Sequence, residues 1–250
     1  MTITNGVSTL VTVEGILFDM DGTLVDSTAA VEVTMGQWAT KQGIEPSYFF
    51  SHSHGVRTRD NVRRFQTVPI PGSELSEEEL IKTVEELETL IAENGRLLAE
   101  AGGRGIVALP GMHTLLDALK AGGARFGIVT SATALYADSA LKTANVHGLP
   151  FRITGDQCLA ALRKLEGPPI TDASQVLVFE DAPSGLKAGL AAGCRTLAVC
   201  TSHTRDQIRA IEATYRVVDL TRVEVVKIDN EAGTVTLKLR LLETEDELEK

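Results

Sequence analysis

Short apolar runs recur along the chain, and stretches with helical spacing separate them. Apolar runs without alternation are typical of parallel strands covered on both faces; they lie at residues 13–19, 124–130, 151–154, 175–179 and 195–200. Helical spacing predicts helices at residues 113–121, 133–144, 159–165 and 184–192. Strands that alternate with helices in this way predict an α/β fold with a Rossmann-like, doubly wound parallel sheet.

One long stretch interrupts this alternation. Ser76 and Glu79 form a capping-box pattern, and apolar residues follow it at helical spacing, namely Leu80, Val84, Leu87, Ile91 and Leu98. An earlier helix is predicted over residues 28–42. We interpret residues 28–108 as an inserted helical cap. The α/β core then comprises residues 1–27 and 109–250. The alternative is that these helices simply pack on the sheet.

The C-terminal part has a different pattern. Apolar and polar residues alternate at 234–240, as in a strand with one exposed face. Together with residues 224–229 and the short turn segment between them, this pattern predicts a C-terminal β-hairpin on the edge of the sheet. The acidic residues 243–250 are interpreted as a solvated end.

The charge of the chain excludes some classes of partner. The 250 residues can bury a core without disulfides or structural metals. Lys and Arg number 24 against 34 Asp and Glu, so the formal net charge is −10. Such a chain lacks the basic surface of a nucleic-acid-binding protein and gives no reason to expect an anionic membrane as partner. No apolar run approaches the roughly 18 residues of a membrane span.

The N-terminus and the cysteines indicate a compartment. The first Lys or Arg is Lys41, so the N-terminus matches neither a secretory signal nor a transit peptide. The cysteines Cys158, Cys194 and Cys200 have no CxxC spacing, which argues against a zinc site or a disulfide framework. We therefore expect reduced thiols and a cytoplasmic protein.

Two acidic residues, Asp19 and Asp21, directly follow the first predicted strand. Ligands of open α/β sheets bind beyond the carboxyl ends of strands, so both carboxylates can share one site. Asp19 can attack phosphorus, while Asp21 can protonate the leaving alkoxide and then deprotonate the attacking water. Because carboxylates repel a phosphate dianion, this chemistry requires a divalent cation, and hard oxygen ligands suit Mg²⁺. The alternative is an ordinary Asp-Gly surface turn.

Residues 16–27, which contain both acids, resemble motif one of the haloacid dehalogenase (HAD) superfamily. The resemblance implies that Asp19 is the nucleophile and Asp21 the acid/base. It also implies a Ser or Thr at the end of the next core strand, where Thr130 and Ser131 stand. A hydroxyl and backbone N–H groups there would hold a phosphoryl oxygen. The alternative for this pair is the cap of the following helix.

Residues 176–185 are similar to the acidic fourth motif of the same family. This similarity implies that Asp181 ligates Mg²⁺ and that Glu180 binds it directly or through water, beside Asp19 and Asp21. Asp181 could instead, or in addition, cap the helix that begins near Ser184.

The third motif of the family is a Lys that neutralises the nucleophile and the phosphoryl oxygens, and the chain departs from the family here. Residues 153–158 begin as relatives do, and the sequence then runs directly into the next helix at Leu159, without the usual Lys segment. Three explanations are open. A gene-model or splicing error removed the segment, Lys164 or Arg163 reaches the phosphate instead, or activity is reduced. Loss of one such electrostatic group typically costs roughly 10²–10³ in rate.

Residues 53–58, in the predicted cap, resemble the cap of fungal glycerol-phosphate and 2-deoxyglucose-6-phosphate phosphatases. This resemblance extends over nearly the whole chain outside the missing segment. It implies Arg57 as a cap residue that contacts substrate; the alternative is a structural salt bridge within the cap. His52 and His54 alone are a weak indication of a metal site.

These motifs predict a Mg²⁺-dependent phosphatase that acts on a small phosphorylated sugar or polyol through an aspartyl-phosphate intermediate. Closure of the cap would exclude bulk water. A catalytically impaired relative that binds phosphometabolites or has a structural role is the alternative, and a phosphomutase would use the same carboxylates. A true dehalogenase is disfavoured, because carbon–halogen displacement needs neither a leaving-group acid nor a cation.

Overall fold

The chain folds into two compact units. The computed structural model describes residues 7–53, 56–67, 75–147, 152–154, 167–202 and 212–242. The first unit, here called the core unit, comprises Met1–Val25, Ala108–Thr130 and Val146–Lys250. The second, the helical unit, comprises Asp26–Val107 and Ser131–Asn145. The division into a core of residues 1–27 and 109–250 and a cap of residues 28–108 stays a prediction.

The core unit contains a six-stranded parallel sheet with the strand order β6-β5-β2-β7-β8-β9. The strands are β2 (Gly15–Phe18), β5 (Phe126–Thr130), β6 (Arg152–Thr154), β7 (Val176–Glu180), β8 (Arg195–Val199) and β9 (Tyr215–Val217). The predicted α/β class and its five predicted strands are confirmed, and β9 is an additional strand. All four residues of β2 are buried, as expected for a central strand covered on both faces.

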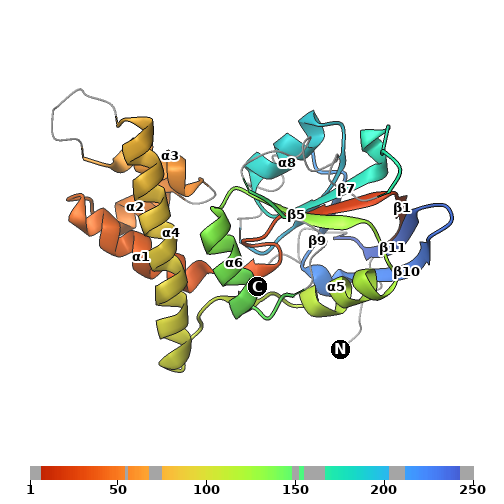
Figure 1. Cartoon of the computed structure of the whole chain (residues 1–250), viewed down its shortest axis with the longest axis horizontal. Helices are drawn as coiled ribbons and strands as arrows, with labels where there is room; N and C mark the ends of the chain where they lie inside the picture. The colour runs from red at the N-terminus through yellow and green to blue at the C-terminus, as the bar shows by residue number, and fades with distance from the viewer. Residues whose placement is uncertain are drawn as a thin grey trace. The chain divides into compact units, whose positions relative to one another are not determined.

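Two helices cover opposite faces of this sheet, α5 (Met112–Ala121) on one and α8 (Pro183–Ala191) on the other (Figure 1). The right-handed rule for parallel crossovers explains this arrangement, because the chain moves along the sheet in opposite directions before and after β7. The helix predicted at residues 159–165 lies outside the described residues.

The predicted C-terminal hairpin is present as β10 (Val223–Asp229) and β11 (Thr234–Arg240). Its predicted position on the edge of the parallel sheet is wrong. It forms a separate antiparallel sheet with β1 (Ser8–Val13), in the order β1-β11-β10. The backbone N–H of Glu14 donates to the carbonyl oxygen of Gln175 at 2.7 Å, and the chain passes from one sheet to the other at this residue.

The helical unit contains α1 (Thr28–Lys41), α2 (Pro46–Ser53), α3 (Thr58–Phe65), α4 (Glu77–Glu100) and α6 (Ala134–Thr143) (Figure 1). Its apolar core comprises Met35, Trp38, Ala39, Phe49, Val62, Leu80 and Leu87. The predicted capping box starts α4: the Ser76 hydroxyl accepts from the N–H of Glu79, and the Glu79 side chain accepts from the N–H of Ser76. Both α1 and α6 pack on α4.

The remaining elements are short. Strands β3 (Val25–Asp26) and β4 (Val107–Ala108) pair with each other and contain two of the points where the chain passes between the units. Two 3₁₀ turns, η1 (Ala173–Gln175) and η2 (Leu220–Arg222), precede β7 and β10. Within the described parts of the chain, each helix is too short or too polar to span a membrane.

Candidate active site

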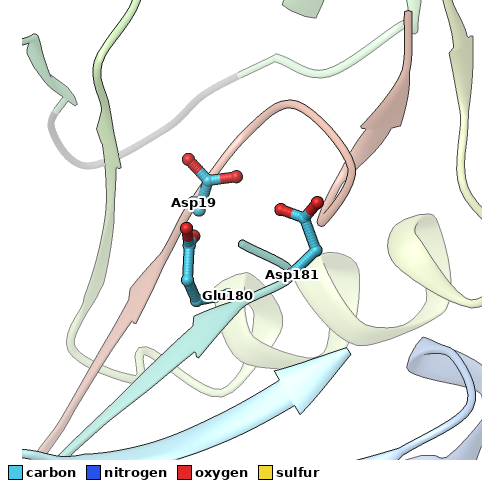
Figure 2. A group of neighbouring side chains, drawn as sticks. All are labelled: Asp19, Glu180 and Asp181. Atoms are coloured by element: carbon cyan, nitrogen blue, oxygen red, sulfur yellow. The ribbon is translucent and has the colours of Figure 1, made fainter. Parts of the chain in front are cut away.

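Three carboxylates meet at the carboxyl edge of the parallel sheet. Asp19 follows β2, Glu180 ends β7 and Asp181 comes next. The neighbouring strands are in register, with Phe18 opposite Phe179, and the N–H of Asp19 continues the ladder by donating to the carbonyl oxygen of Phe179 at 2.9 Å. One oxygen from each of the three carboxylates lies within 4.8 Å of the others. Figure 2 shows all three directed into the same space.

Aromatic residues of three neighbouring strands pack against one another: Phe18 ends β2, Phe179 precedes the last residue of β7, and Phe126 begins β5. The ring of Phe18 lies 4.6 Å from that of Phe179 and 6.2 Å from that of Phe126, centroid to centroid. All three residues are almost fully buried. Such aromatic packing leaves little freedom for the strands to slide, so the acidic side chains emerge from a rigid edge.

Burial sets the electrostatics of these carboxylates. Glu180 and Asp181 are only 6% and 3% exposed, whereas Asp19 keeps some contact with solvent. Burial raises the pKa of Asp19 well above its usual value, and the charges of Asp181 and Asp21 raise it further, against hydrogen bonds from Met20 and Thr23 that lower it. Burial likewise raises the pKa of Glu180, followed by the charges of Asp19 and Asp181.

This donor set fits a hard divalent cation. The three carboxylates offer oxygen ligands, which Mg²⁺ prefers. Burial, followed by the charges of neighbouring carboxylates, raises the pKa values of Asp19 and Glu180, because negative charge is costly in a buried place. A bound cation would offset that charge. Asp19, Glu180 and Asp181 are therefore the described residues best able to hold one.

Two glycines make room for the carboxylates. Gly22 has a φ of +85°, and a Cβ atom there would lie 2.3 Å from Oδ2 of Asp181. Gly185, in the first turn of α8, is equally tight: a Cβ atom would lie 2.1 Å from Oε1 of Glu180. Both positions require glycine if the acidic side chains are to keep their places.

Hydroxyl groups that the sequence analysis did not identify hold Asp181 and the loop after β2. The fully buried Thr23 donates to Oδ1 of Asp181 at 3.3 Å, and the hydroxyl of Ser202 donates to Oδ2. Thr201 donates to the carbonyl oxygen of Gly22. A sequence signal existed, because Thr201 and Ser202 follow the predicted strand at residues 195–200 and so lie at the same sheet edge.

Asp21 and Thr130 also lie at the carboxyl ends of core strands. Asp21 pairs with Val25 in a short bridge, and its charge raises the pKa of Asp19. It is not part of the three-carboxylate group found among the described residues. Thr130 is 3% exposed and ends β5, which pairs with β2. The chemical roles of Asp21 and Thr130 stay predictions.

The remaining predicted residues belong to the helical unit or lie outside the described residues. Ser131 begins the segment that belongs to the helical unit. Arg57, also in the helical unit, donates from Nε to Oδ2 of Asp60 at 2.7 Å, which is the salt bridge considered as its alternative role. Lys164, Arg163, Cys158 and His54 lie outside the described residues.

Comparisons with known proteins agree with this architecture. A family model described as haloacid dehalogenase-like hydrolase matches residues 13–193. Hexitol phosphatase A of Escherichia coli is 33% identical, over 74% of this chain and 82% of that protein. The 2-deoxyglucose-6-phosphate phosphatase 1 of Saccharomyces cerevisiae is 31% identical, over 88% of this chain and 92% of that protein.

Solved structures share the fold. A HAD hydrolase of family IA, variant 3, from Entamoeba histolytica matches with a TM-score of 0.65 and 22% identity, over 88% of this chain and 96% of that one. The beta-phosphoglucomutase of Clostridium difficile matches with a TM-score of 0.63 and 19% identity, over 88% of this chain and 96% of that one. At these identities the similarity concerns the fold alone.

Proposed function

Because this chain belongs to the haloacid dehalogenase-like hydrolases, we propose that it hydrolyses the phosphate monoester of a small sugar or polyol. The observation that carries the proposal is the position of Asp19 beside Glu180 and Asp181 at the carboxyl ends of two paired parallel strands. The relatives named hexitol phosphatase A and 2-deoxyglucose-6-phosphate phosphatase support the substrate class.

Asp19 is the proposed nucleophile. One of its carboxylate oxygens attacks phosphorus, a bond from that oxygen to phosphorus forms, and the bond from phosphorus to the ester oxygen breaks. Asp21, two residues further along the same loop, donates a proton to the departing alkoxide. The product of this step is an aspartyl phosphate on Asp19 and a free alcohol.

In the second step Asp21 acts as a general base instead of a general acid. It accepts a proton from water as the water oxygen attacks the phosphoryl group, and the bond between phosphorus and Asp19 breaks. Inorganic phosphate leaves, and both carboxyl groups return to their starting states. Thr130 and Ser131 are proposed to hold the phosphoryl oxygens, with Lys164 as the cation in place of the family's usual Lys.

Asp19, Asp21, Glu180 and Asp181 are the proposed ligands of Mg²⁺. When bound, Mg²⁺ supplies the positive charge that offsets repulsion between these carboxylates and the phosphate. The raised pKa values of Asp19 and Glu180 support this proposal, because they reflect burial first and repulsion from neighbouring carboxylates second, and a bound cation would offset that repulsion. Thr23 and Ser202 keep Asp181 in one orientation through both of its oxygens.

An activity assay tests the proposal. Purified protein is given p-nitrophenyl phosphate, hexitol phosphates, 2-deoxyglucose 6-phosphate and glycerol 1-phosphate, each with Mg²⁺ and with EDTA. We expect hydrolysis with Mg²⁺, and a loss of about 10³-fold or more in Asp19→Asn, with the exposed Asp117→Asn on α5 unchanged. Full activity in Asp19→Asn would refute the nucleophile assignment, and failure to hydrolyse any of these esters would refute the phosphatase.

A catalytically impaired binding protein is the second candidate, favoured by one observation: the sequence lacks the family's Lys segment after residue 158. The two candidates differ in what Lys164 does. If Lys164 replaces the missing Lys, Lys164→Met lowers turnover by about 10²–10³, while Lys142→Met, at an exposed position in the last turn of α6, does not. No turnover in the wild type, together with retained phosphate binding, would favour the impaired protein.

A further inference from the structure

A cavity lies at the amino-terminal edge of the parallel sheet, away from the acidic cluster. Its volume is about 520 Å³, and residues of the core unit alone line it. Glu14 in its wall directly precedes β2, and Phe126 begins β5. Glu14 and Asp19 stand at opposite ends of β2, which separates them by roughly 16 Å of extended chain. The cavity is therefore distinct from the proposed active site, and its volume is typical of small-molecule sites.

Helix α5 and the C-terminal hairpin complete the walls of this cavity. Within the core unit α5 packs on β10 (Figure 1). The last turn of α5 contributes Lys120, and the hairpin contributes Ile228, Asn230 and Thr234. Amide and hydroxyl groups both donate and accept hydrogen bonds. The wall thus combines apolar surface with groups that suit a polar ligand.

Two cationic side chains in this wall have only neutral partners. Arg125 donates from Nη2 to the carbonyl oxygen of Pro168 at 2.6 Å, and Lys120 donates from Nζ to the carbonyl oxygen of His147. Among the described residues, the buried Nε of Arg125 has no hydrogen-bond partner. Neither cation forms an ion pair with another described residue. Both positive charges are therefore left without a carboxylate.

Unpaired positive charge stands out in this protein, whose formal net charge is −10. An anion is repelled by the chain as a whole but attracted where cations gather. A guanidinium matches the geometry of phosphate oxygens, and an ammonium adds a point charge. Arg125 retains donors that no described residue uses. The two side chains together therefore favour a phosphate group in this cavity.

We propose that this cavity binds a small organic phosphate that carries hydroxyl groups. The phosphate lies at Arg125 and Lys120, and the hydroxyl groups contact Glu14, Asn230 and Thr234. Glu14 disfavours a ligand that is anionic throughout, but its carboxylate accepts hydrogen bonds from hydroxyls. The inference does not depend on the proposed function, because none of these residues has a part in the proposed reaction.

The contrasting explanation is structural. Lys120 and Arg125 then only hold the chain at His147 and Pro168 through their carbonyl oxygens, and the cavity contains water. In that case the two side chains contribute to the melting temperature, but no phosphate binds. Binding of a ligand to the folded state raises the melting temperature, so the two explanations differ in a direct measurement.

Calorimetry of the full-length protein in EDTA tests the proposal with glycerol 3-phosphate, propyl phosphate and glycerol. EDTA removes the cation that the acidic cluster needs to hold a phosphate. We expect glycerol 3-phosphate to bind and to raise the melting temperature, propyl phosphate to bind more weakly, and glycerol not to bind. Lys120→Gln and Arg125→Gln should each weaken binding of glycerol 3-phosphate about tenfold. Lys187→Gln, at an exposed position of α8, should match the wild type.

Circular dichroism establishes that each variant is folded, and Lys120→Gln alone suffices if Arg125→Gln is not. A crystal structure with glycerol 3-phosphate in EDTA locates the ligand. The proposal is overturned if the wild type binds no phosphate in EDTA, if the folded variants bind it as tightly as the wild type, or if the ligand lies elsewhere. Equal affinities for glycerol 3-phosphate and propyl phosphate would overturn the hydroxyl contacts. Hydrolysis with Mg²⁺ but no binding in EDTA overturns this site alone and leaves the proposed function intact.

Discussion

Gly22 and Asp181, separated by most of the chain, lie so close together that a Cβ atom on Gly22 would stand 2.3 Å from Oδ2 of Asp181. The loop after β2 therefore passes directly over the carboxylate that follows β7. Thr23 on the same loop donates to the other oxygen of that carboxylate. The position of Asp181 thus depends on a backbone conformation that only glycine adopts easily at residue 22.

Gly22→Ala should disturb the proposed metal site in addition to straining the backbone. A left-handed alanine costs about 1–2 kcal/mol, and the new methyl group must also displace Asp181. Gly43→Ala is the control, because Gly43 has a φ of +75° but open space around it. Urea unfolding and calorimetric titration with Mg²⁺ measure both. We expect the backbone to lower the stability of both variants by a similar amount, whereas only Gly22→Ala loses Mg²⁺ binding. Equal Mg²⁺ affinities of the two variants would contradict a clash between the new methyl group and Asp181.

Glu180→Gln should stabilise the metal-free protein at neutral pH. Burial and neighbouring carboxylates raise the pKa of Glu180 above its ordinary value of 4.5, so the folded state binds the proton more tightly than the unfolded chain. The stability from this proton is complete below about pH 4.5 and is lost as the pH rises through the folded-state pKa. The variant, which cannot ionise here, should therefore be more stable than the wild type at pH 8.

Unfolding in EDTA between pH 4.5 and 8 tests this expectation. The stability difference between Glu180→Gln and the wild type should widen with pH, and Mg²⁺ should reduce it by stabilising the wild type. Glu224→Gln, at an exposed position of β10, serves as the control. If the free energies of unfolding of the wild type and Glu180→Gln differ by the same amount at every pH, ionisation of Glu180 does not destabilise the folded protein.

Ser202→Ala should weaken metal binding without changing the fold. The Ser202 hydroxyl donates to Oδ2 of Asp181. Groups that orient a metal ligand typically contribute about 10–100-fold to the affinity for the metal ion. Titration of the substrate-free protein with Mn²⁺, followed by electron paramagnetic resonance, measures the affinity directly. Thr236→Ala, which removes an exposed hydroxyl bonded to Thr12 at 2.9 Å, should have no effect. Unchanged Mn²⁺ affinity in Ser202→Ala would rule out the orienting role.

Arg57→Ala and Asp60→Ala distinguish the two roles considered for Arg57. Their ion pair is partly exposed, and such pairs contribute at most about 1 kcal/mol. If Arg57 contacts substrate, Arg57→Ala raises KM about tenfold or more, whereas Asp60→Ala leaves KM nearly unchanged. If the ion pair is the whole role of Arg57, both variants show the same small loss of stability and an unchanged KM. Steady-state kinetics with the best sugar phosphate provides the measurement.

Local pattern was sufficient to predict the parallel sheet and its acidic edge. The apolar runs before Asp19 and before Glu180 and Asp181 predicted buried strands, and parallel strands end at one edge of a sheet. The resemblance to two motifs of the family implied that these acids share one site. The capping box at Ser76 and Glu79 was equally local, since its partners are three residues apart. Each of these features depends on side chains near one another in sequence or on strand polarity.

Other features depend on contacts between distant segments, which a local pattern does not contain. The pairing of β1 with β11, the hydroxyl of Ser202 at Asp181 and the carboxylate of Glu88 at Thr133 all join residues far apart along the chain. The amino-acid sequence alone thus predicted five of the six strands of the parallel sheet and the acids that stand at the ends of two of them. The tertiary structure decided which hydroxyls, glycines and buried charges surround them, because those neighbours arise only when separate elements pack.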